Sequence, residues 1–204
     1  MGAGITGAFI AHRLAEEGLD IVVVDKRDVC AGSTSANTAL LQYELDTSLV
    51  DLTERIGRPN AEQVYRVCYD SITAIERLVT AQKLRCIYQR RKSVYLASRR
   101  SDAALMRVEC RARRAVGIEV ECWNEEEVRA QFSFSRPAAL VSDRAAELDS
   151  HRLAHALLGL AADKGARIFD RTLVKKYHTN TQAVRLETDR GCKVVAKHAV
   201  FATG

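Results

Sequence analysis

Three glycines near the start of the chain have the spacing of a phosphate-binding turn. In a Gly-x-Gly-x-x-Gly turn the first glycine permits a tight bend, the second lets the backbone approach a pyrophosphate, and the third lets the following helix pack closely. Free N–H groups and the positive dipole end of that helix attract phosphate oxygens. The motif therefore predicts a dinucleotide site formed by Gly2, Ala3, Gly4, Ile5, Thr6 and Gly7.

An acidic residue stands where a ribose would bind. Asp25 ends the apolar run of residues 19–25 and follows Gly4 by 21 residues. A carboxylate at this spacing accepts hydrogen bonds from a ribose hydroxyl. In an NAD-binding module the same carboxylate would repel the 2′-phosphate of NADP. A glycine-rich turn that holds no ligand is the alternative interpretation.

The elements around these residues alternate between helix and strand. Apolar residues recur at helical spacing after the glycines, and Gly18 stands at the end of that helix. The run 19–25 is typical of a buried parallel strand, and the small polar residues 31–42 predict a loop. A helix capped by Asp149 or Ser150 and ended by Gly165 restores the α/β pattern. Three extended segments follow, at 173–178, 183–188 and 193–201.

The middle of the chain predicts a different order of helices and strands. Residues 60–82 keep a helical apolar rhythm with Asn60 as the expected N-cap. Residues 84–98 predict two strands around a basic turn, and residues 101–116 a further helix. A strand at 118–123 and a short helix capped by Asn124 complete this part.

Composition limits the function classes. The chain has 204 residues and a formal net charge of +5, but its basic residues lie outside any recognised nucleic-acid motif, so no nucleic-acid partner is expected. No apolar run is long enough for a membrane span, and no secretion signal is recognisable, so a cytoplasmic location is expected. The six cysteines contain no Cys-x-x-Cys pair and are interpreted as reduced thiols.

The segment "GAGITGAFIAHRLAEEGLDIVVVDKRDVCAGSTSAN" resembles the N-terminal signature of the FAD-dependent D-amino acid oxidase superfamily. That group includes glycine and sarcosine oxidases, D-amino acid dehydrogenases and flavin glycerol-3-phosphate dehydrogenases. The likeness continues through "LDSHRLAHALLGLAADKGARIFDRTLV" and "HAVFATG", and so spans nearly the whole chain.

The resemblance implies FAD as cofactor and oxidation of an amino acid, amine or similar small substrate by hydride transfer. The glycines would hold the pyrophosphate, Asp25 the adenosine ribose with Lys26 nearby, and Val174 the adenine. Ser33 and Thr34 would contact the phosphates or the ribityl chain. Thr38, Ala39 and Leu40 would lie along the isoalloxazine edge. A second turn, formed by Ala202, Thr203 and Gly204, would pass close to the dinucleotide.

The fold class that follows is α/β, a Rossmann-like FAD-binding domain with an inserted, incomplete α+β substrate domain. Residues 1–84 and 148–204 are assigned to the FAD-binding domain and 85–147 to a partial substrate or cap domain. The family pattern has an apolar strand before the first glycine and continues beyond the last one, so truncation at both ends is expected. Glycine oxidases tend to have Gly at position 39, where this chain has Ala39.

Two alternatives stay open: a truncated, non-catalytic dinucleotide-binding fragment, and an NAD-binding module. Without a first strand, the edges of the sheet would be left unpaired, and the chain alone is expected to bind FAD weakly or to be poorly stable. No catalytic residue is assigned and the oligomeric state is left open. His151 and His155 stand four residues apart on a helix, but Arg152 replaces the glutamate of the zinc-protease motif, so no metal site is expected and the histidines are interpreted as partly buried.

Overall fold

The computed structural model of the chain describes residues 1–203 and divides into two compact units. Unit 1 comprises residues 1–39, 84–86 and 149–204, and unit 2 comprises 40–83 and 87–148. Residues 40–83, assigned from the sequence to the FAD-binding domain, pack within unit 2. No helix within residues 1–203 is long and apolar enough to cross a lipid bilayer.

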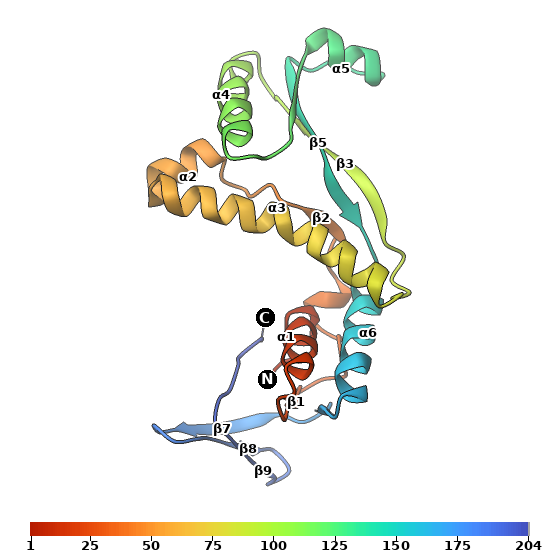
Figure 1. The fold of residues 1–204 in the computed structure, drawn as a ribbon, viewed down its shortest axis with the longest axis vertical. Helices are drawn as coiled ribbons and strands as arrows, with labels where there is room; N and C mark the ends of the chain where they lie inside the picture. The colour runs from red at the N-terminus through yellow and green to blue at the C-terminus, as the bar shows by residue number, and fades with distance from the viewer. Residues whose placement is uncertain (204) are drawn as a thin grey trace. The chain divides into compact units, whose positions relative to one another are not determined.

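Unit 1 contains two helices side by side, α1 (Ile5–Glu16) and α6 (Ser150–Asp163) (Figure 1). They accompany a parallel pair of strands, β1 (Val22–Val24) and β6 (Arg167–Phe169). Alanines of α1 and leucines of α6 are buried, as the helical apolar spacing predicts. Gly18, just after α1, has a φ of 73°, which is the left-handed conformation of a helix end.

A short 3₁₀ turn η1 (Ser33–Ser35) and an antiparallel sheet complete unit 1. The sheet has the order β7 (Val174–Thr179), β8 (Val184–Thr188) and β9 (Lys193–Ala196), which confirms the three predicted extended segments, the last one shorter than expected. An apolar cavity of about 530 Å³ lies along β1 and is also lined by residues 194–200.

Unit 2 is an antiparallel sheet with helices packed against it. The central strand is β5 (Ala138–Glu147), which pairs antiparallel with β3 (Gln89–Leu96) on one edge. On its other edge it pairs with β2 (Leu40–Gln42) and β4 (Glu121–Asn124). Figure 1 shows β3 and β5 as the long strands of this sheet.

Four helices belong to unit 2: α2 (Leu49–Ile56), α3 (Arg58–Ala81), α4 (Asp102–Ala115) and α5 (Glu125–Gln131). The sequence analysis missed α2 and placed the N-cap of α3 at Asn60. That placement is wrong, because α3 begins two residues earlier after Gly57, and the Asn60 side chain instead donates to the carbonyl of Ile56. The Asn124 cap of α5 is confirmed, with a complete capping box to Glu127.

The structure corrects the expectation of two strands around a basic turn. Residues 89–96 form one strand and not two around a basic turn, because Arg90, Arg91 and Lys92 lie on an exposed edge strand with a register shift between Arg91 and Ser93. Basic side chains and bulges are common on such edges since they discourage pairing with other chains.

The expectation of reduced thiols is wrong for Cys110 and Cys122, which form a disulfide between α4 and β4. Cysteine pairs that are distant in the sequence cannot be matched from spacing alone. The other four cysteines stay reduced.

A buried arginine organises the core of unit 2. Arg113 donates from Nε to Glu109, 2.7 Å away, and its guanidinium lies 5.4 Å from the ring centre of Tyr43. Glu109 also accepts from the backbone N–H groups of Leu49 and Val50 at the start of α2. A carboxylate at a helix N-terminus satisfies N–H groups that lack partners inside the helix. Arg113 and Glu109 thus connect α4 to α2.

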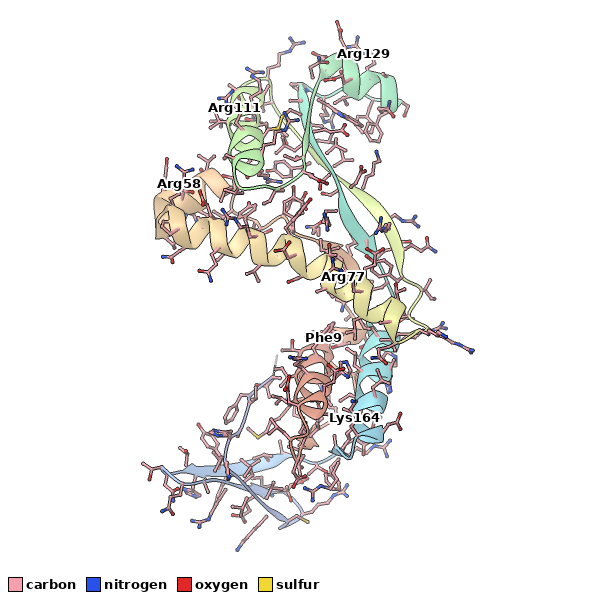
Figure 2. All side chains as sticks on the ribbon, viewed as in Figure 1. Phe9, Arg58, Arg77, Arg111, Arg129 and Lys164 are labelled. Carbon is pink, nitrogen blue, oxygen red and sulfur yellow. A yellow bond between two sulfur atoms is a disulfide. The ribbon has the colours of Figure 1, made fainter. Side chains whose placement is uncertain are left out.

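The surface arginines of unit 2 contrast with this buried one. Arg58, Arg77, Arg111 and Arg129 are exposed and project from α3, α4 and α5 (Figure 2).

Candidate functional site

The start of helix α1 has the geometry of an anion cradle. Gly2 has a φ of 98°, and a Cβ there would overlap the carbonyl oxygen of Ala202. A Cβ at Gly7 would overlap the carbonyl oxygen of Gly2, and a Cβ at Gly4 would lie 2.9 Å from Thr34 Oγ1. The predicted glycine positions are therefore those at which this turn tolerates no side chain.

Backbone donors remain available at the start of α1. The first N–H groups of a helix have no acceptor within it. Gly4 is the N-cap residue and provides no side-chain cap, and the first turn carries no acidic residue. The N–H groups of Thr6 and Gly7 are thus free of intrahelical acceptors, and the dipole of a 12-residue helix favours an anion there.

Thr34 supports this helix start from the polar loop. Its buried Oγ1 accepts a hydrogen bond from the Ile5 N–H at 2.9 Å. The Thr34 carbonyl oxygen accepts from Asn37 Nδ2 at 3.1 Å and from Ser150 Oγ at 2.9 Å. The loop is consequently held both to the glycine turn and to the first residue of α6.

The Asp25 carboxylate lies beneath the glycine turn. Its Oδ2 accepts from the Ala3 N–H at 2.7 Å and its Oδ1 from the Arg27 N–H at 2.8 Å. Each carboxylate oxygen can accept more than one hydrogen bond, so Asp25 retains capacity for a ribose hydroxyl. The residue that sequence analysis assigned to the ribose therefore also orders the turn.

Cys30 packs directly against the same turn. Its N–H and its thiol both donate to the Ala3 carbonyl oxygen, at 3.2 Å and 3.3 Å. Burial, and to a smaller extent the negative charge of Asp25, raises the pKa of the Cys30 thiol to about 11. Cys30 thus supports the cradle through its two bonds to the Ala3 carbonyl oxygen.

Asn37 is a residue that sequence reasoning missed. Its Oδ1 accepts from the Ala39 N–H at 2.8 Å and from Ser150 Oγ at 3.0 Å. The signal was present, because an asparagine that bonds to the backbone two residues ahead forms a common turn. This turn holds Ala39 at a φ of 60°, a left-handed conformation that favours glycine.

The other predicted residues are less closely connected. Lys26, Ser33 and Thr38 are exposed, and Val174 is half-buried at the start of β7. The Ala202 N–H donates to the Met1 carbonyl oxygen at 2.8 Å, which places the second turn beside the glycines, and Thr203 is exposed next to it. Leu40 begins β2 and belongs to unit 2. Gly204 lies outside the described residues.

The two helix histidines do not form a metal site with other residues. His151 and His155 are both exposed, which corrects the expectation that they are partly buried, and their ring centres lie 4.5 Å apart. Within residues 1–203 no group of three or more His, Cys, Asp or Glu side chains is suited to hold a metal ion.

The residues of unit 1 fit the phosphate and ribose parts of FAD. The cradle offers donors to a pyrophosphate at positions where side chains are excluded, and a carboxylate stands at the end of β1. Within unit 1 the parts of the site come from four places in the chain, namely the glycine turn, the end of β1, the loop around η1 and the segment next to Ala202.

Comparisons with known proteins agree with this fit. The family model described as FAD dependent oxidoreductase (DAO) matches residues 1–204. A Bacillus subtilis protein provisionally named Rieske 2Fe-2S iron-sulfur protein YhfW is 22% identical over 173 residues, which cover 85% of this chain and 33% of that protein.

Solved structures show the same fold. Glycine oxidase from Geobacillus kaustophilus is 21% identical with a TM-score of 0.79, over 100% of this chain and 54% of that one. L-proline dehydrogenase from P. horikoshii is 18% identical with a TM-score of 0.77, over 96% and 49%. L-alpha-glycerophosphate oxidase from Mycoplasma pneumoniae, solved with FAD bound, is 16% identical with a TM-score of 0.71, over 92% and 48%.

The chain spans about half of the length of these solved structures and a third of the curated relative. The family match nevertheless extends over the whole chain. This protein therefore belongs to the family of FAD-dependent oxidoreductases, and FAD is its cofactor.

Proposed function

We propose that unit 1 holds FAD and that the chain takes part in the oxidation of an amino acid or amine by hydride transfer to the flavin. The observation that carries the proposal is the start of α1: its glycines admit no Cβ, Thr34 and Asp25 accept from the N–H groups of Ile5 and Ala3, and the N–H groups of Thr6 and Gly7 have no acceptor within the helix. Unit 2 would then contribute to the substrate domain.

Each predicted site residue has a role in this proposal, all of them in unit 1 except Leu40. The turn from Gly2 to Gly7 binds the pyrophosphate, and Asp25 binds the adenosine ribose with Lys26 nearby. Ser33 and Thr34 contact the phosphates or the ribityl chain, and Thr38, Ala39 and Leu40 lie along the isoalloxazine edge. Val174 contacts the adenine. Ala202, Thr203 and Gly204 form the second turn beside the dinucleotide.

The chemistry divides between cofactor and protein. When bound, FAD supplies the hydride acceptor. The described residues position the cofactor in this proposal. The start of helix α1 compensates the phosphate charge, and Thr34 and Asn37 order the loop that leads to the flavin ring. The neutral Cys30 thiol keeps the underside of the turn free of a second negative charge beside Asp25. No side chain is assigned as a catalytic residue.

The substrate class rests on similarity alone. Proteins of similar structure include glycine oxidase, L-proline dehydrogenase and L-amino acid deaminase, each named for an amino acid substrate. L-alpha-glycerophosphate oxidase has the same fold, so a hydroxyl substrate is the alternative outcome of a substrate screen.

A titration with FAD tests the proposed cofactor site. We expect saturable quenching of flavin fluorescence that excess NAD does not reverse. Gly4→Ala should weaken binding at least about tenfold, since the new methyl group would lie 2.9 Å from Thr34 Oγ1 and disturb the bond that this oxygen accepts from the Ile5 N–H. The matched control is Gly159→Ala in α6, where a Cβ meets no atom within 4 Å.

The strength of binding tests a separate expectation. Within residues 1–203, β1 pairs with β6 alone, and its other side borders the apolar cavity of about 530 Å³. We therefore expect the 204-residue chain to bind FAD weakly, and co-purification of stoichiometric flavin would contradict that expectation. Release of NAD instead of flavin from the heated protein would overturn the FAD proposal.

The reaction is tested with the flavin-loaded protein under anaerobic conditions. Loss of the visible flavin absorbance after addition of an amino acid or amine would support the activity. Stable FAD binding without reduction by any member of an amino acid, amine and glycerophosphate panel would favour a non-catalytic fragment.

A further inference from the structure

Ser150, the first residue of α6, holds the polar loop from a distant part of the chain. Its Oγ lies 2.9 Å from the Thr34 carbonyl oxygen and 3.0 Å from Asn37 Oδ1, which belong to residues 116 and 113 positions earlier. A hydroxyl carries one proton, so the two acceptors share it in a three-centre bond. All three residues belong to unit 1. Ser150 therefore joins the start of α6 to two points of the loop.

The two acceptors of this bond are also joined to each other and to Ala39. Asn37 Nδ2 donates to the Thr34 carbonyl oxygen at 3.1 Å, and Asn37 Oδ1 accepts from the Ala39 N–H at 2.8 Å. Ala39 has a φ of 60°, a left-handed conformation that a residue with a Cβ keeps only where its surroundings hold it. Loss of the Ser150 hydroxyl would therefore loosen Asn37 and, through Asn37, the backbone of Ala39.

The glycine turn has supports that do not involve Ser150. Thr34 Oγ1 accepts from the Ile5 N–H, and Asp25 Oδ2 accepts from the Ala3 N–H. Both bonds remain when the Ser150 hydroxyl is removed. The contribution of Ser150 thus falls on residues 37–39 more than on the turn that precedes α1.

Helix α6 does not depend on the Ser150 hydroxyl. Asp149 is its N-cap residue, and the Asp149 Oδ1 accepts from the Arg152 N–H at 2.9 Å. Alanine has a higher helix propensity than serine, so an alanine at position 150 leaves the helix capped and intact. The hydroxyl of Ser150 therefore serves the loop and not the helix that carries it.

We propose that Ser150 is a positioning residue for the isoalloxazine ring of FAD. Ser150 holds Asn37, Asn37 holds Ala39, and Ala39 lies along the edge of the ring in the proposed site. The inference rests on the proposed function and adds to it a residue that acts through the loop and not by contact with the cofactor. Supporting bonds of this kind matter because a small displacement of a positioned group weakens binding and slows the reaction. Ser150 thus acts on the flavin half of FAD more than on its ADP half.

The test compares FAD with ADP, which contains only the adenosine and pyrophosphate part of the cofactor. Quenching of flavin fluorescence measures FAD binding, and competition with FAD measures ADP binding. Ser150→Ala should weaken FAD binding about fivefold and change ADP binding by less than about twofold, because the variant loses one shared hydrogen bond of the loop. The visible circular dichroism per bound flavin should also decrease at saturation, since this signal reports how firmly the ring is held.

Two further variants serve as controls. Ser150→Thr keeps the hydroxyl and should restore both the FAD affinity and the circular dichroism of the flavin. Ser71→Ala is the matched control in α3, because the Ser71 hydroxyl donates to the Val67 carbonyl of its own helix in unit 2. This control should bind FAD and ADP as the original chain does. Urea unfolding of each variant verifies that it remains folded.

Two results would overturn the inference. The first is unchanged FAD affinity and unchanged circular dichroism in Ser150→Ala. The second is an equal loss of affinity for FAD and ADP, which would locate the effect at the glycine turn and not at the ring. Absence of FAD binding to the original chain is a different result, because it contradicts the proposed function itself and the inference with it.

Discussion

The Ile5 N–H donates a hydrogen bond of 2.9 Å to Thr34 Oγ1, which joins the first residue of α1 to a loop 29 positions further along the chain. The acceptor is buried, and the helix has no side-chain cap of its own. Thr34 therefore does for α1 what an N-cap residue usually does, but from a distant segment. The glycine turn and the polar loop form one structural unit through this bond.

Thr34→Val should weaken FAD binding about tenfold. Valine has a similar shape but leaves the Ile5 N–H without its acceptor, at a cost of about 1–3 kcal/mol. Thr34→Ser keeps the hydroxyl and should bind FAD almost as well as the original chain. Thr53→Val is a control in unit 2, where the hydroxyl bonds only to the Leu49 carbonyl of its own helix. Equal FAD affinity in Thr34→Val would show that this bond does not support the cradle.

Local sequence signals predicted the elements that border the cradle. The apolar run before Asp25 forms the parallel strand β1, and Asp149 caps α6 by accepting from the Arg152 N–H. These signals succeed because the capping bond and the apolar periodicity arise within a few residues. The bond from Thr34 to Ile5 depends on tertiary structure, so composition could identify the loop but not its contact.

The missed strand β5 shows the limit of periodicity. Residues Ala138 to Ser142 are all buried because the strand is central and covered on both faces. A strand buried in this way lacks the alternation of a half-exposed strand. Its alanines and the charged Asp143 and Arg144 also carry weak strand propensity. Only its pairing partners reveal it.

Ala39→Gly should stabilise the protein by about 0.5–1 kcal/mol. Ala39 has a φ of 60°, where a residue with a Cβ loses about 1–2 kcal/mol. Glycine removes that strain, but it also raises the entropy of the unfolded chain, which cancels part of the increase in the free energy of unfolding. Urea unfolding would show a higher midpoint for the variant. A lower midpoint would mean that the Asn37 side chain already compensates the strain through its bond to the Ala39 N–H.

Glu109→Ala should destabilise unit 2 by about 3–5 kcal/mol. The change leaves the buried guanidinium of Arg113 without its 2.7 Å partner and frees two N–H groups at the start of α2. Arg111→Ala on the same helix is the control, because that side chain is exposed (Figure 2). Similar urea midpoints for the two variants would contradict a structural role for the buried ion pair.

The Cys30 thiol should resist alkylation in mildly alkaline buffer, whereas the exposed Cys192 thiol reacts. Burial raises the Cys30 pKa from 9.0 to about 11, so little reactive thiolate forms below that pH. Since the folded pKa is higher than the unfolded one, the stability that neutral Cys30 contributes is complete below pH 9 and is lost as the pH rises toward 11. Mass spectrometry of iodoacetamide-labelled peptides distinguishes the two sites. Equal labelling of both thiols in the folded protein would refute the assignment.

Reduction of the Cys110–Cys122 disulfide should lower the unfolding free energy of unit 2 by about 3 kcal/mol, the value for a loop of this size. The bond connects α4, which carries Glu109 and Arg113, to β4 on the sheet. Its loss would therefore loosen the helix that holds the start of α2. Urea unfolding with and without reductant measures the effect, and the double variant Cys110→Ala, Cys122→Ala should be insensitive to reductant. An unchanged midpoint of the original chain on reduction would show that the disulfide adds nothing to stability.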